Sequence, residues 1–196
     1  MSTRYGIFFA IMLLNFQVGA NADENMNWLL RGDYRISANS FCVQTSEFGD
    51  PPTYALLGYG ISVDDHGSGV ITFDGAGSAT EISNGFYKVE GFPDAFSPGR
   101  SPAGTYENVC TYTYVVEKDR SVTMNGSCDS LVTSGGPTPY TVHVSGIRSS
   151  GQIDRQRDVL IGTSADNHII TLEDSFGGVY QRRCGATSTA IRIRSD

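Results

Sequence analysis

Four cysteines constrain the fold of this chain more than any other feature. They are Cys42, Cys110, Cys128 and Cys184. An even number of cysteines is typical of a disulfide framework in an exported chain. There is no Cys-x-x-Cys motif, and no cysteine lies near a histidine at ligand spacing, so we expect no zinc site. All four thiols can pair, so we also expect no catalytic thiol.

The alternation of residues predicts one of the two pairings. In 106–116 and in 122–128 the cysteine, the aromatic residues and several apolar residues fall at even positions. This period of two is typical of half-buried strands. A hairpin that turns at 118–120 places Cys110 directly opposite Cys128. Directly opposed residues have Cα atoms about 4.5–5.5 Å apart, a distance that a disulfide can bridge.

Cys42 and Cys184 remain as the second pair. The first cysteine ends an expected strand at 32–42 and the second ends one at 179–184, so the disulfide would tie the first strand to the last or next-to-last. The hairpin at 118–120 has one defect. Its last position favours glycine in the left-handed conformation, and Arg120 occupies it, so the turn could be one residue longer.

The N-terminus predicts an export signal. Arg4 precedes an apolar run at 7–14, and Ala20-Asn21-Ala22 has the small-x-small pattern of a cleavage site. The run is too short for a helix across a bilayer core of about 30 Å. A buried N-terminal helix or an uncleaved anchor fits less well, because acidic and polar residues follow at once. We therefore expect a signal peptide at 1–22, cleavage after Ala22, and a secreted or periplasmic protein.

The remaining chain, 23–196, has the size of one domain. It contains no second long apolar run, so we expect no transmembrane segment in the mature protein. The whole sequence has 14 Lys and Arg against 21 Asp and Glu, a formal net charge of −7. That balance argues against a nucleic-acid partner and against adhesion to anionic lipid.

The rest of the chain also reads as strands separated by turn residues. We predict an all-β fold of about eight to ten strands that form a closed, antiparallel, up-and-down β-barrel. A sandwich is the alternative. Short turns favour the up-and-down order, and a first-to-last disulfide favours closure, which also removes exposed edges. The expected strands are 32–42, 69–73, 78–89, 106–116, 122–128, 140–144, 159–161, 169–172, 179–184 and 190–194.

The alternation also predicts which side chains face inward. The inner set is Tyr34, Tyr112, Tyr114, Val116, Val122, Met124, Val142, Val144 and Tyr180. The outer set is Thr111, Thr113, Thr123, His143 and Ser145.

Gly32-Asp33-Tyr34 at the first strand resembles the Gly-x-Trp signature of lipocalins and other calycin barrels, with tyrosine in place of tryptophan. In those families a basic side chain near the end of the chain packs over this aromatic ring. Arg182 is the first candidate for that residue and Arg192 the second. The resemblance implies an eight-stranded barrel with a cavity for a small ligand.

The inward tyrosines suggest what such a ligand would be. Buried tyrosine hydroxyls need hydrogen-bond partners, so an apolar or aromatic ligand should also carry polar groups. The same rings could instead fill a solid core. Two long loops, 45–54 and 91–104, stand out, and long loops often bind ligands. Phe92 and Phe96 either cap the core or line the barrel mouth. The candidate ligand-binding residues are Tyr34, Phe92, Phe96, Tyr112, Tyr114, Tyr180 and Arg182.

Candidate catalytic residues are sparse. His66 and His168 fall in stretches of turn composition, and His143 falls on the polar face of its strand. No pair has metal-ligand spacing, and neither a Gly-x-Ser-x-Gly motif nor a P-loop is present. We expect no catalytic residue, metal or cofactor. Three functions remain open: a barrel that binds a small molecule, a binder of a protein partner such as a protease inhibitor, and a small barrel isomerase or cyclase.

Overall fold

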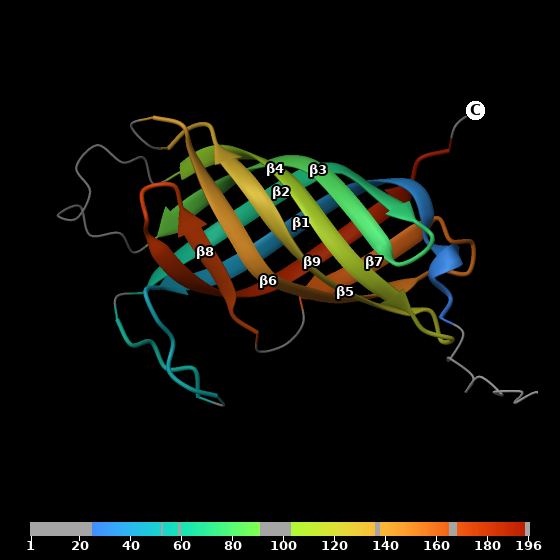
Figure 1. The fold of residues 1–196 in the computed structure, drawn as a ribbon, viewed down its shortest axis with the longest axis horizontal. Coiled ribbons are helices and arrows are strands. Elements are labelled where there is room, and N and C mark those ends of the chain that lie inside the picture. The colour runs from blue at the N-terminus through green and yellow to red at the C-terminus, as the bar shows by residue number, and fades with distance from the viewer. Residues whose placement is uncertain are drawn as a thin grey trace, which may run out of the picture.

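The structure is a computed structural model that describes residues 25–51, 53–58, 60–90, 103–135, 138–164 and 168–194. Its strands form one antiparallel sheet that closes into a barrel (Figure 1). The all-β prediction and the closed barrel are therefore confirmed. The described elements are η1 (Asn27–Leu29), β1 (Arg31–Thr45), β2 (Ile61–Asp74), β3 (Ser78–Glu90), β4 (Ala103–Val116), β5 (Ser121–Val132), β6 (Tyr140–Ile153), β7 (Val159–Ser164), β8 (Ile170–Asp174) and β9 (Val179–Arg192).

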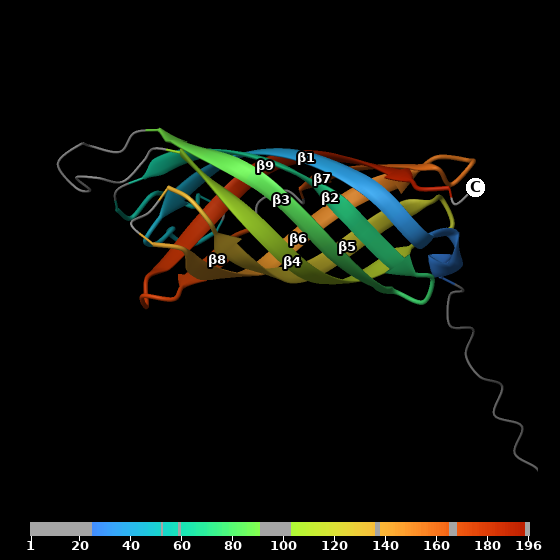
Figure 2. The same ribbon diagram turned by 90° about the horizontal axis from the view of Figure 1, so that it is seen from above.

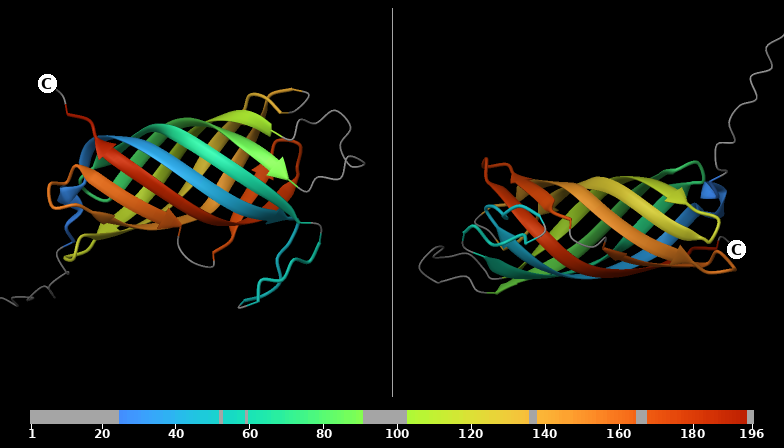
Figure 3. Two further views of the ribbon diagram at one scale, coloured as in Figure 1. Left: turned by 180° about the vertical axis from the view of Figure 1, so that it is seen from behind. Right: turned by 90° about the horizontal axis from the view of Figure 1, so that it is seen from below.

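The strands follow one another around the barrel in chain order, and β9 closes it by pairing with β1 (Figure 2). Two short strands share one position, because β7 pairs with one end of β6 and β8 pairs with the other. Both also pair with β9. The barrel thus has eight strand positions. Figure 3 shows this wall from behind and from below.

A serine hydroxyl replaces part of the ladder where β7 ends. The Ser164 hydroxyl donates to the carbonyl of Cys184 at 3.0 Å and accepts from the amide of Ala186 at 3.1 Å. These bonds satisfy two backbone groups of β9 between the stretches that pair with β7 and with β8.

The predicted hairpin register is correct. Val116 faces Val122, Tyr114 faces Met124, and Cys110 faces Cys128. The expected defect is also present, because Arg120 has a φ of 69°. Its amide donates to the carbonyl of Glu117 at 2.9 Å, which closes the turn without an extra residue.

Both predicted disulfides are present. Cys110–Cys128 joins β4 to β5, and Cys42–Cys184 joins β1 to β9. Each joins directly paired residues, with Cα atoms 4.0 Å apart. The first-to-last disulfide therefore spans the seam at which the barrel closes.

The inner and outer faces of the strands agree with the alternation, with two differences. Several inward residues are only half-buried, because most of them line a cavity and not a solid core. Ser145 is half-buried instead of exposed, since a bulge in the β5–β6 pairing interrupts the alternation there. The buried inner residues are Tyr34, Tyr114, Val116 and Val122, and the half-buried ones are Tyr112, Met124, Val142, Val144 and Tyr180. The exposed outer residues are Thr111, Thr113, Thr123 and His143.

Two predictions of local structure were wrong. The stretches 179–184 and 190–194 were expected to be separate strands, but β9 runs through 179–192. The small residues between them stay extended because they pair with β1. Similarly, 64–67 has turn composition but lies within β2, where pairing with strands on both sides keeps it extended.

One end of the barrel is closed. The turn η1 lies across it, on the right in Figure 1. Leu29 and Leu30 are buried there beside Tyr34, and Asn27 joins η1 to the barrel. The Asn27 side chain accepts from the amide of Val116 at 2.8 Å and donates to two carbonyls. Within the described residues no helix is both long and apolar enough to cross a membrane.

Candidate functional site

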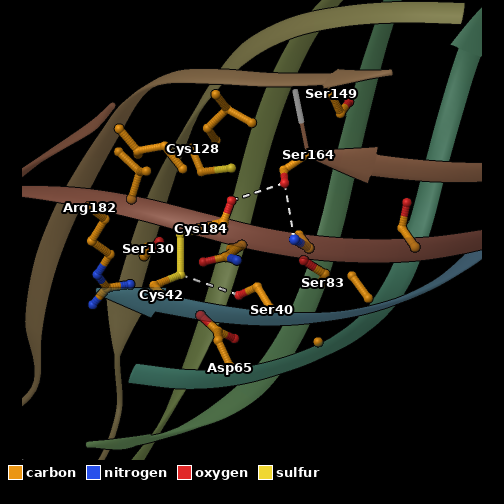
Figure 4. Close-up of a pocket in the computed structure, with 18 of the residues that line it drawn as sticks. Ser40, Cys42, Asp65, Ser83, Cys128, Ser130, Ser149, Ser164, Arg182 and Cys184 are labelled. Carbon is orange, nitrogen blue, oxygen red and sulfur yellow. Dashed lines mark hydrogen bonds between the residues drawn. A yellow bond between two sulfur atoms is a disulfide. The ribbon is translucent and has the colours of Figure 1, made fainter. Parts of the chain in front are cut away.

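The barrel encloses a cavity of about 580 Å³ between the closed end and the opposite end. Figure 4 shows part of its wall, with serine, cysteine and charged side chains. Ligand pockets usually measure about 300–1,000 Å³. The inward tyrosines therefore do not fill the interior, and the barrel has room for a small molecule.

Glycines keep this cavity open by giving the tyrosine rings space along the wall. Three inward tyrosines each lie against the glycine directly opposite on the neighbouring strand. A Cβ atom added to Gly126 would lie 2.3 Å from Cδ1 of Tyr112, and one added to Gly85 would lie 2.5 Å from Cζ of Tyr106. The rings therefore occupy the volume that a side chain would take. The three pairs are Tyr87 with Gly104, Tyr106 with Gly85, and Tyr112 with Gly126.

A charged cluster lies toward the open end. Arg182 donates from Nε to the Gln44 side chain at 2.6 Å, and the Tyr106 hydroxyl donates to the Asp65 carboxyl. Figure 4 shows Arg182 and Asp65 in the wall of the same cavity. Burial raises the pKa of Asp65 and lowers that of Arg182, although each charge partly offsets the effect on the other. Burial and the nearby Asp65 charge raise the pKa of Tyr106.

A second polar group lies deeper, on β3 and β4. The Tyr112 hydroxyl donates to Oε2 of Glu81 at 3.0 Å, and burial, followed by the Glu81 charge, raises the pKa of Tyr112. Asn108 is paired across the strands with Ser83 and Ser130. Its side-chain oxygen is buried and has no hydrogen-bond partner, which is true of no other side-chain atom in the described residues. The deep wall therefore offers hydrogen-bond acceptors to the cavity.

The sequence-predicted ligand residues do not all reach this cavity. Tyr112 and Arg182 line it. Tyr34 and Tyr114 lie at the closed end, where both rings pack edge-on against Phe73. Tyr180 is half-buried but is not among the lining residues. Phe92 and Phe96 fall outside the described residues.

Arg192, the second candidate, lies over the Tyr34 ring, with Cζ 5.5 Å from the ring centre. It also donates to the carbonyl of Arg31 at 2.6 Å. Arg182 faces the cavity instead. The reason is the continuous β9 strand, in which the register that pairs Cys42 with Cys184 also pairs Tyr34 with Arg192.

Sequence reasoning missed the acidic and amide residues of the cavity. Asp65 lies in 64–67, whose turn composition gave no sign of an inward-facing strand position. Glu81 and Asn108 lie on strands that were predicted, at inward positions of their alternation. The signal that could have found these two is a polar side chain at an inward position, which is uncommon unless it has a partner or a role.

Neither the known protein families nor the curated proteins and solved structures include one that matches this chain. Across the described ranges, no group of three His, Cys, Asp or Glu side chains could hold a metal ion. The site is thus defined by its geometry: a barrel cavity with an apolar lining, a charged cluster toward its mouth and acceptors in its depth.

Proposed function

We propose that this protein is an exported barrel that binds a small molecule in its cavity. The cavity itself is the observation that carries this proposal, because its size matches known ligand pockets. The two disulfides support an oxidising compartment, in line with the expected signal at 1–22 and a secreted or periplasmic location. A filled interior would have favoured the alternative role in binding a protein partner, so the open cavity favours the small-molecule function.

The lining suggests an amphiphilic ligand. Apolar side chains from several strands line the cavity, among them Ile36, Val63, Met124 and Val144. The carboxyl, amide and guanidinium groups of the same cavity require hydrogen-bonding groups on the ligand. We therefore expect an apolar or aromatic body with at least one polar group. The ligand would enter at the open end, where β3 ends and β4 begins.

A pair of neighbouring substitutions tests this function. Ala38 lines the cavity, and Ser37 beside it is exposed on the outer face. Ala38→Trp should fill the cavity and weaken binding of the neutral fluorescent probe N-phenyl-1-naphthylamine by about tenfold or more. Ser37→Trp should leave binding unchanged. Fluorescence titration measures the affinity, and thermal unfolding checks that both variants fold.

Two results would contradict the proposal. One is that the wild-type protein does not bind the probe. The other is that a folded Ala38→Trp variant binds as tightly as the wild type, which would place the probe outside the barrel.

A further inference from the structure

We propose that the deep wall of the cavity, at Glu81 and Asn108, binds the protonated amine of a small amphiphilic ligand. This inference rests on the proposed function and names the class of ligand. It comes from two acceptors on adjacent strands, each with an oxygen that no described residue satisfies.

The first acceptor is the side-chain oxygen of Asn108. This oxygen is buried and lacks a hydrogen-bond partner among the described residues, and Asn108 belongs to the residues that line the cavity. A buried acceptor without a partner destabilises the protein, so such atoms are rare and usually have a role. Ser83 and Ser130, which Figure 4 shows in the cavity wall, are its cross-strand neighbours. A hydrogen-bond donor on the ligand would satisfy it.

The second acceptor is the carboxylate of Glu81. Tyr112 donates to Oε2, while Oε1 has no hydrogen bond from the described residues. Glu81 on β3 pairs with Cys110 on β4, and Ser83 pairs with Asn108, so the two acceptors lie two rungs apart, diagonally across the same face of this pair of strands. An ammonium group has three donors and could bond both oxygens at once.

The charges of the molecule favour an amine over a neutral hydroxyl. Two carboxyl groups, of Glu81 and Asp65, lie in the cavity lining together with two arginines, of which Arg182 lies toward the mouth and Arg148 is exposed. Arg182 already bonds Gln44, and Asp65 is near enough to influence its pKa. Glu81 has no cation bonded to it in the described residues. The formal net charge of −7 for the whole chain also attracts cations.

Three probes with the same hydrocarbon chain test the inference: decylamine, decanol and decanoate. Each is titrated against bound N-phenyl-1-naphthylamine at pH 7. In the wild type, decylamine should displace the probe about tenfold more tightly than decanol, because a charge-assisted hydrogen bond is stronger than a neutral one. Decanoate should be the weakest of the three.

Two variants and a control locate the effect. Glu81→Gln and Asn108→Leu should each reduce the preference for decylamine over decanol to about threefold or less, while decanol binding stays within about twofold. Glu107→Gln is the control, because Glu107 neighbours Asn108 in sequence but is exposed on the outer face. It should keep the full preference. Asn108→Leu should also raise the melting temperature of the free protein, because it removes the unsatisfied acceptor.

The outcomes separate this inference from the proposed function. If the wild type binds the neutral probe but does not prefer decylamine over decanol, the amine site is wrong and the carrier function stands. A preference for decanoate would place the polar group at Arg182 instead and also overturn the amine site. If both deep-wall variants fold and keep the preference, Glu81 and Asn108 do not hold the amine. Failure to bind the neutral probe at all would contradict the proposed function.

Discussion

At the scale of single residues, Tyr114 shows how one hydroxyl supports the closed end of the barrel. Its hydroxyl donates to the carbonyl of Leu30 at 2.9 Å and accepts from the amide of Gly75 at 3.0 Å. The hydroxyl thereby satisfies a backbone carbonyl next to η1 and a backbone amide in the β2–β3 turn. Burial raises its pKa to about 12.

This pKa predicts loss of stability at alkaline pH. Below pH 10 the phenol is neutral in both the folded and the unfolded state, so it does not make the free energy of unfolding depend on pH. Between about pH 10 and 12 the unfolded state loses the proton first, and the free energy of unfolding falls as pH rises. Tyr34, Tyr106 and Tyr112 have raised pKa values as well and act in the same direction.

The Tyr114→Phe variant isolates the contribution of this one tyrosine to stability and to its loss at alkaline pH. At pH 7 the variant should be less stable by about 1–3 kcal/mol, because the Leu30 carbonyl and the Gly75 amide each lose a partner. Above pH 10 it should lose stability less steeply than the wild type. Denaturant unfolding at several pH values measures both effects. Equal slopes for the two proteins above pH 10 would show that Tyr114 does not contribute to the alkaline loss.

At the scale of elements, the β4–β5 hairpin is closed by a turn with an unfavourable residue. Arg120 adopts a φ of 69°, a conformation in which a side chain costs about 1–2 kcal/mol relative to glycine. Its side chain makes a compensating contact, because Nη1 donates to the carbonyl of Asp154 at 3.0 Å. The backbone strain at Arg120 is therefore partly offset by a hydrogen bond to the β6–β7 turn, which also lies at the closed end.

A comparison of two substitutions separates the strain from the contact. Arg120→Gly and Arg120→Ala both remove the hydrogen bond to Asp154, but only glycine relieves the strain. The glycine variant should be more stable than the alanine variant by about 1 kcal/mol. Thermal or denaturant unfolding measures the difference. An alanine variant as stable as the glycine variant would mean that the backbone relaxes away from the left-handed region.

At the scale of the whole molecule, the contribution of each disulfide to stability is expected to depend on how far apart in sequence its two cysteines lie. The two disulfides have similar geometry, since each joins directly paired residues with Cα atoms 4.0 Å apart. They differ in sequence separation, which is 142 residues for Cys42–Cys184 and 18 residues for Cys110–Cys128. The long separation is a direct result of closing the first strand on the last.

The loop-entropy account predicts unequal losses when the disulfides are removed. Replacing Cys110 and Cys128 by alanine should cost about 3 kcal/mol, and replacing Cys42 and Cys184 should cost about 5 kcal/mol. Unfolding of the two double variants in the same denaturant measures the order. If the hairpin variant is the less stable of the two, local strand pairing and not ring size governs the contribution of these bonds.

Much of the fold was predictable because alternation is a local property. Most of the inward and outward sets, the 118–120 turn with its unfavourable Arg120 and the Cys110–Cys128 disulfide follow from residue types at spacings of two. The Cys42–Cys184 disulfide follows as the remaining pair. The Tyr34–Arg192 contact is also predictable from the sequence. The antiparallel register that sets Cys42 against Cys184 moves eight residues in each direction to that pair. A prediction of two separate strands at 179–184 and 190–194 interrupts this register and therefore does not yield the contact.

By itself, the sequence determined most of the strands, their faces and the Cys110–Cys128 pair, since each depends on neighbours along the chain or directly across a hairpin. Cys42–Cys184 then followed as the remaining pair. Only the tertiary structure decided that the interior is open, that Asp65, Glu81 and Asn108 line it, and that β7 and β8 share one position. These features depend on how side chains from all the strands divide a common volume. A tyrosine at an inward position can fill a barrel or lie along its wall. Here Tyr87, Tyr106 and Tyr112 lie along the wall because each is paired with a glycine on the neighbouring strand, which leaves space for the ring.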